Sequence, residues 1–430
     1  MTPGSSAPRA TFVPALPPRV SPTAAVASLA GHSGDVEAFF AELAARGGAF
    51  VSDDPPSGTA TVCVAHPVMP AGTEVFALVD TLTHVHRDRL EHFRLEPLAA
   101  HGAEVLAIAL VLPRALRATV SLLVETGRTP SLVTDRSAWR AAYERTRALA
   151  GTTEVVRDGA GRANVHALPG APPTPWPARE VTGAVLSPTR ATRRPRAPGV
   201  HEHRFFSEVL GLQMRVRAVV PHPTFGEATA VVVVLDGERW TLDYPILDGL
   251  AHLHEDGACG PTLALHVAPE DPGRRAELLG MNAGLPRFLV DELLPWGASL
   301  TTTPTDPARR AIAGVSLGGL AAADVVRRAP DAFGNAIVQS GSFWWPGADG
   351  TEGEQLRLWH AEGPALAGRV RIFHEVGALE GLLLADNLAF RDVAAASGVQ
   401  IVSREVTGGH DHAIWRVGLL DGIAHLFPSV

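Results

Sequence analysis

The strongest constraint on the fold of this 430-residue chain is the alternation of strand-like and helix-like segments from residue 200 onward. The run "ATAVVVVLDG" is almost entirely β-branched, as in a strand that is buried on both faces of a sheet. Further strand-like runs, such as "TLALHVAP" and "NAIVQSGS", are separated by helical segments such as "LGGLAAADVVRRAP". This alternation predicts an α/β fold with a mostly parallel central sheet and helices on both faces.

The chain is longer than one domain usually is, and its composition changes along the sequence. Residues 1–24 are rich in Pro, Ser and Ala and are predicted to be disordered. Residues 25–150 contain β-branched segments bounded by Pro and Gly, which predict a smaller β-rich accessory domain. Residues 151–199 are Pro-rich, with a solvated basic cluster at 190–196, and predict a linker or arm. We expect residues 200–430 to form the α/β domain.

The composition excludes several classes of function. A net charge of −8 and a pI of about 6.1 argue against a nucleic-acid or membrane-surface binder. No apolar run approaches the ~20 residues of a membrane span, and the N-terminus lacks the pattern of a secretory signal. The two cysteines, Cys63 and Cys259, fall in different predicted domains, which fits a reducing compartment. We therefore expect a cytoplasmic protein with no nucleic-acid or membrane partner; the oligomeric state is not predicted.

One serine stands between a predicted buried strand and a predicted helix, in the sequence "GVSLGG". This is the setting that the motif G-x-S-x-G needs to form a nucleophile elbow, a sharp turn that exposes the serine hydroxyl. Ser316 is therefore the candidate nucleophile, with a purely structural turn as the alternative. The backbone N–H of Leu317 would supply one oxyanion donor. The second donor is expected after the earlier strand "VVVVLDGERW", from Gly237 or Glu238.

A serine nucleophile needs a base and an acid that orients the base, and in an α/β-hydrolase they follow the serine in the order acid, then histidine. His410 follows a strand and a Gly-Gly turn in "EVTGGHDHAIW", and is the preferred base, with His412 as the rival. Glu380 lies just beyond the strand "RVRIFHEVG" and is the preferred acid. The alternative acids are Glu375, Asp386 and Asp411.

The C-terminal region resembles the enterochelin (ferric enterobactin) esterase family, within the esterase D-like group of α/β-hydrolases. The resemblance is carried, in order, by "FFSEVLG", "VVVLDGERW", "RRAEL", "AGVSLGGLAA", "FGNAIVQSGSFWW", "EVGALEG" and "VTGGHDHAIWRVGLLDGI". It implies the same triad of Ser316, Glu380 and His410. It also implies that the N-terminal region is a β-sandwich accessory domain, a match of architecture rather than of motifs.

The resemblance further implies a group of residues that meets the substrate. It places an arginine of the R-x-x-E-L motif against the substrate, and both Arg274 and Arg275 remain candidates for it. The other implied residues near the pocket are Trp240, Ser342, Trp344 and Trp345. Aromatic rings suit flat catecholate groups, although a core role fits the tryptophans as well.

The activity that the resemblance implies is hydrolysis of the trilactone ester bonds of an iron-loaded catecholate siderophore, without a cofactor or a catalytic metal. The alternatives on the same scaffold are a general carboxylesterase or an S-formylglutathione hydrolase-like enzyme, which the fold does not separate. Two non-hydrolase readings stay open. "HEH" at 201–203 and "HLHE" at 252–255 contain metal-ligand types, and a hydrolase fold can also serve only for binding.

Overall fold

The computed structural model of the chain contains two sheet-based units and describes most of its residues. The described residues are 13–23, 36–80, 82–100, 103–127, 135–151, 155–158, 161–174, 180–182, 185–187, 199–243 and 246–429. The basic cluster at 190–196 lies outside them.

The C-terminal unit, residues 199–429, contains one eight-stranded sheet with the order β12-β13-β15-β14-β16-β17-β18-β19. The first two strands pair antiparallel, and every pairing from β15 to β19 is parallel. The carboxyl ends of the parallel strands therefore lie at one edge of the sheet. The strands are β12 (Gly199–Ser207), β13 (Leu212–Val220), β14 (Ala230–Leu235), β15 (Thr262–Pro269), β16 (Arg310–Val315), β17 (Asn335–Gln339), β18 (Arg371–Gly377) and β19 (Gln400–Val406).

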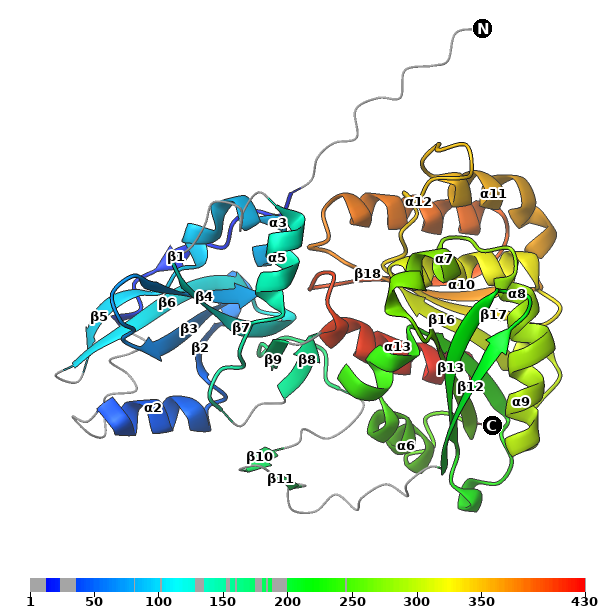
Figure 1. The fold of residues 1–430 in the computed structure, drawn as a ribbon, viewed down its shortest axis with the longest axis horizontal. Coiled ribbons are helices and arrows are strands. Elements are labelled where there is room, and N and C mark those ends of the chain that lie inside the picture. Colours follow the sequence, from blue (N-terminus) through cyan, green and yellow to red (C-terminus); the bar gives the residue numbers. More distant parts are fainter. Residues whose placement is uncertain are drawn as a thin grey trace, which may run out of the picture.

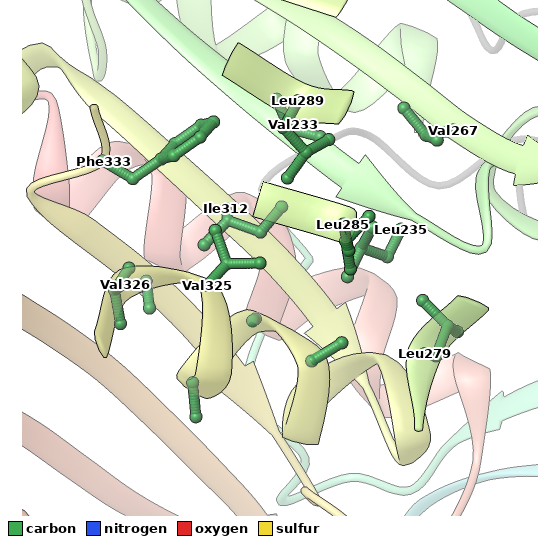
Figure 2. Packing of buried hydrophobic residues seen from close by; sticks show 14 of the residues in the cluster. Val233, Leu235, Val267, Leu279, Leu285, Leu289, Ile312, Val325, Val326 and Phe333 are labelled. Atoms are coloured by element: carbon green, nitrogen blue, oxygen red, sulfur yellow. The ribbon is translucent and has the colours of Figure 1, made fainter. Parts of the chain in front are cut away.

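Helices cover both faces of this sheet, as expected for an α/β fold (Figure 1). One face packs under α10 and its neighbours, where Val325, Val326 and Phe333 meet Val233 and Ile312 of the sheet (Figure 2). The other face packs under α6 and α13. The helices are α6 (Leu247–Glu255), α7 (Arg275–Leu279), α8 (Leu285–Phe288), α9 (Leu294–Leu300), α10 (Leu317–Arg328), α11 (Glu354–Glu362), α12 (Leu382–Ala396) and α13 (His412–Leu426).

The N-terminal unit is a β-sandwich of two antiparallel sheets. Residues of both sheets share one core, in which Val62 and Leu110 of the first sheet join Ala77 and Val120 of the second. The first sheet consists of β1 (Arg19–Val20), β2 (Ala49–Asp54), β3 (Thr59–Pro67), β5 (Glu96–Ala100) and β6 (Ala103–Pro113). The second consists of β4 (Thr73–Val79), β7 (Arg117–Thr126), β8 (Val155–Asp158) and β9 (Gly161–Ala167). Its helices are α2 (Val36–Ala45), α3 (Leu82–Val85) and α5 (Arg136–Tyr143), and a separate hairpin is formed by β10 (Glu180–Thr182) and β11 (Val185–Ser187).

The structure differs from two of the expected regional boundaries. Residues 155–167, expected in the linker, form β8 and β9, and β9 pairs with β7 of the sandwich. The composition of 151–199 as a whole does not indicate these strands, because β8 is short and the Pro-rich stretch begins only after residue 168. Within the segment 1–24, Arg19–Val20 pair antiparallel with β6. We propose that the N-terminal domain extends to residue 168.

Candidate active site

Ser316 occupies a strained turn between β16 and α10. Its φ angle is +56°, a left-handed conformation that a residue with a side chain rarely adopts. The turn is tight enough that a Cβ at Gly314 would lie 2.2 Å from the carbonyl oxygen of Gly318. The strain and the two glycines together are the geometry of a nucleophile elbow.

The neighbouring strands end in the same unusual way. Asp236 after β14 has a φ of +56°, and Ser340 after β17 has a φ of +48°. Three adjacent strands thus end in a left-handed, non-glycine residue at one edge of the sheet. Strain of this kind costs roughly 1–3 kcal/mol per residue and gathers at functional sites.

His410 joins this serine to Glu380 in a hydrogen-bonded series. Its Nε2 lies 3.0 Å from Ser316 Oγ, and its Nδ1 lies 2.7 Å from Glu380 Oε2. The His410 side chain is 39% exposed, whereas that of Glu380 is fully buried. Such an arrangement can deprotonate the hydroxyl and hold the resulting imidazolium beside a carboxylate.

Two loops at the carboxyl end of the sheet carry the acid and the base. Glu380 lies in the turn between β18 and α12, and His410 in the loop between β19 and α13. The backbone N–H of Leu379 donates to the carbonyl of Gly408 at 2.9 Å, so the two loops are joined directly. Parallel strands bring these distant segments to the same place.

A further serine, which the sequence reasoning did not select, orients the acid. Ser340 Oγ donates to Glu380 Oε1 at 2.5 Å and accepts from Trp415 Nε1 at 2.9 Å. The backbone N–H of Gly377 donates to the same carboxylate oxygen at 2.8 Å. Glu380 thus has one oxygen fixed by the protein interior and the other on His410.

The rival acid Glu375 lies elsewhere. Its side chain is 1% exposed and accepts from Gln339 at 2.7 Å and from Arg404 at 2.6 Å. Burial raises the pKa of Glu375 to about 7, against the lowering influence of Arg404 and Gln339. The carboxyl therefore belongs to a buried polar group under α13 rather than to the series that contains His410.

The other rivals make different contacts. His412 packs its ring against Trp240 and Trp415, and burial lowers its pKa well below the usual value. Asp411 is buried and caps α13 by accepting from the N–H of Ala413 at 2.8 Å. Asp386 is buried within α12.

The candidate oxyanion donors follow the ends of two paired strands, β16 and β14. Leu317 is the first residue of α10, where a helix leaves its N–H groups without helical partners. Gly237 follows β14, and a Cβ there would lie 2.5 Å from the backbone nitrogen of Val267, so only glycine fits. Burial, with the nearby Asp236 carboxylate, raises the pKa of Glu238, while its own backbone hydrogen bond and the nearby arginines lower it.

The two candidate arginines point in different directions. Arg275 forms a two-point ion pair with Asp236, with nitrogen–oxygen distances of 2.5 and 2.7 Å. That carboxylate lies 3.2 Å from the Cβ position of Gly318 in the elbow, so Arg275 is next to the site. Arg274 instead pairs with Glu277 on the surface.

The residues expected to line the pocket divide into two groups. Ser342 Oγ lies 3.4 Å from Ser316 Oγ, and Trp344 beside it is 38% exposed. Trp345 is partly buried and packs over Gly280. Trp240 differs from the expectation, because it is 1% exposed and donates its indole N–H to the carbonyl of Leu235. Its apolar surface is used in the core beneath α6 and α13 rather than in a pocket.

The histidine motifs do not converge on a metal site. Among the described residues, no group of three or more His, Cys, Asp or Glu side chains is arranged to hold a metal ion. His254 accepts a hydrogen bond from the backbone of Thr262 at 3.1 Å, a role within the fold. His203 on the edge strand β12 stacks on Trp296. None of the described helices is both long enough and apolar enough to cross a membrane.

Comparison with known proteins assigns the α/β unit to a family. The Esterase family model ("Putative esterase") matches residues 207–426, just over half of the chain. The chain belongs to this esterase family. The matched region contains the elbow, the Glu380 turn and the His410 loop.

Curated relatives match the same part of the chain. The iron(III) enterobactin esterase of Dickeya dadantii is 34% identical over 206 residues, which cover 46% of this chain and 47% of that protein. The iron(III) salmochelin esterase of Escherichia coli is 29% identical over 226 residues, 51% of this chain and 55% of that protein. The chain spans about half the length of the curated relatives it matches.

The fold resembles a solved structure over nearly its whole length. The crystal structure of ferric enterobactin esterase from Salmonella typhimurium aligns with a TM-score of 0.74 at 25% identity. The alignment covers 88% of this chain and 96% of that one, so both the sandwich and the α/β-hydrolase unit are shared.

Proposed function

We propose that this protein is a serine esterase that hydrolyses the ester bonds of a ferric catecholate siderophore, such as the trilactone of enterobactin. The observation that carries the proposal is the series Ser316–His410–Glu380, with distances of 3.0 and 2.7 Å. The names of the curated relatives supply the substrate class. The iron is cargo of the substrate and takes no part in the chemistry at the serine.

The proposed reaction has two steps, acylation and deacylation of the serine, and the same residues act in both. The Oγ of Ser316 attacks the ester carbonyl carbon while its proton passes to Nε2 of His410. The carbon–oxygen ester bond then breaks, and His410 returns the proton to the departing alkoxide. A water molecule repeats these steps on the serine-bound acyl group and releases it as a carboxylic acid. The side chain of Glu380 orients His410 through Nδ1 and stabilises the imidazolium.

The donors and the arginine near the elbow are the proposed contacts for the substrate. The N–H groups of Leu317 and of Gly237 or Glu238 are the proposed oxyanion donors. Arg275 is the proposed contact for a ferric catecholate complex, which carries negative charge. The exposed ring of Trp344 offers a flat apolar surface for a catechol group.

Variants of the serine and the acid test the proposal. Wild type and Ser316→Ala are compared on ferric enterobactin and on a short-chain nitrophenyl ester, with products followed by mass. We expect wild type to cleave both, and Ser316→Ala to lose about 10³-fold or more in kcat. Glu380→Gln should lose activity strongly, since the histidine then lacks its anionic partner. Full activity of Ser316→Ala would show that Ser316 is not the nucleophile.

A general carboxylesterase or S-formylglutathione hydrolase-like activity is the second candidate, because the triad geometry serves any ester. Wild type that cleaves only the nitrophenyl ester would favour it. We also propose a cytoplasmic location, because Cys63 and Cys259 are buried free thiols, as proteins of reducing compartments have.

A further inference from the structure

The N-terminal sandwich reaches the residue next to the proposed base. Asp411, which follows His410, is 1% exposed, and its Oδ2 accepts from Thr119 of β7. The backbone N–H of Thr119 donates at 2.6 Å, and its Oγ1 donates at 3.1 Å. The other oxygen, Oδ1, caps α13 through Ala413. A buried carboxylate needs hydrogen-bond donors, and Asp411 receives them from both domains.

The architecture of β7 explains why this contact forms at that place. Ladder pairing between β4 and β7 ends at Val79 and Val120, and one further bond follows, from the N–H of Asp80 to the carbonyl of Thr119 at 2.9 Å. The start of β7 extends beyond β4, and the loop that carries His410 lies along it. Arg117 donates its backbone N–H to the carbonyl of Thr407 at 3.3 Å, and Thr119 donates to Asp411 two residues further on. Alternate N–H groups of one strand point the same way, as this arrangement requires.

Apolar residues near the proposed acid and near the proposed base both pack against the N-terminal sandwich. Leu379, next to Glu380, packs against the core shared by the two sheets of the sandwich. Ala413, at the start of α13, packs with Val156 and Ala163 of the sandwich. Figure 1 shows the start of α13 beside β7, β8 and β9.

We propose that Thr119 is a positioning residue for the esterase reaction: through Asp411 it fixes the loop that aims His410 at Ser316. The inference rests on the proposed function, because it needs His410 to act as the base. The N–H of Asp411 donates to the carbonyl of Gly409 at 2.8 Å, so a shift of the Asp411 carboxylate moves the backbone on which His410 sits. The N-terminal sandwich thereby helps to align His410 for proton transfer.

Thr119→Val tests the proposal, since valine has the shape of threonine without its hydroxyl. We expect kcat for ferric enterobactin and for the nitrophenyl ester to fall about tenfold, with KM nearly unchanged, because only the alignment of the base is affected. Thr119→Ser should restore most of kcat. Thr126→Val is the matched control on the same strand, where the hydroxyl only contacts Thr73 on the surface, and it should behave as wild type.

Two further measurements separate positioning from damage to the fold or the cleft. In a Ser316→Ala background, Thr119→Val should leave the Kd for ferric enterobactin unchanged. Asp411→Asn, which keeps a capping side chain for α13, should also lower kcat, since its amide nitrogen meets a donor. The proposal is overturned if Thr119→Val keeps wild-type kcat, if Thr119→Ser restores nothing, or if Thr126→Val loses as much. Failure of the proposed function is seen separately, as activity retained by Ser316→Ala alone.

Discussion

The buried carboxyl of Glu375 makes a prediction about stability that also separates it from Glu380. Burial raises its pKa in the folded protein from 4.5 to about 7. Between these pH values the folded state binds a proton that the unfolded chain has lost, so the free energy of unfolding falls as pH rises. The stabilisation is fully present below pH 4.5 and is lost as pH rises through 7. At 1.36 kcal/mol per pKa unit, it amounts to roughly 3 kcal/mol.

Glu375→Gln removes this titration while Arg404 keeps its second partner, Asp421, at 2.8 Å. Urea unfolding of wild type and variant at pH 5 and pH 8 measures the effect. We expect the difference in unfolding free energy to change by about 2–3 kcal/mol in favour of the variant on going to pH 8. The exposed Glu208→Gln is the control and should follow wild type. Parallel pH profiles of Glu375→Gln and wild type would refute the reasoning, and a kcat lost as completely as in Glu380→Gln would return Glu375 to the triad.

Three other substitutions test the site. Ser340→Ala removes a donor from the Glu380 carboxylate and leaves the Trp415 indole N–H without its acceptor. We expect kcat to fall about tenfold in steady-state kinetics, and the free energy of unfolding to fall by about 2 kcal/mol in urea. Arg275→Gln should raise KM for ferric enterobactin about tenfold, with little change in KM for a neutral nitrophenyl ester. Arg274→Gln is the control, and equal KM values in the two variants would contradict the assignment of Arg275 to the substrate. Gly314→Ala places a Cβ 2.2 Å from a backbone oxygen and should cost at least about 2 kcal/mol of unfolding free energy, a loss that wild-type stability would disprove.

The triad candidates could be selected from the sequence because each follows a strand of a parallel sheet. Such strands deliver their next residues to one edge, so the order serine, acid, histidine together with placement just after a strand favours Ser316, Glu380 and His410. The structure brings these three side chains together. The choice between Glu380 and Glu375 depends on which of them lies beyond the strand, and in the structure β18 ends at Gly377, before Glu380.

Other features depend on contacts that local sequence does not encode. Trp240 follows a strand end like the other site residues, but its side chain turns into the core, and rotamer direction has no sequence signal. The strand β8 has only four residues, and β9 contains Gly, Arg, Asn and His among its seven, so local pattern does not distinguish them from a linker. Thr119 is one of several hydroxyls in a β-branched run, and nothing near it indicates a partner in the other domain.

The bond between Thr119 and Asp411 also has a consequence for the time course of folding. It joins residues 292 positions apart, whereas Ser316 and His410 are separated by only 94. During synthesis β7 emerges early, and this contact can form only once the residues just before α13, the last described helix, have been made. Closing so long a loop has an entropic cost. We expect native α/β structure to appear first on refolding and full esterase turnover to follow in a later phase, when the domains dock.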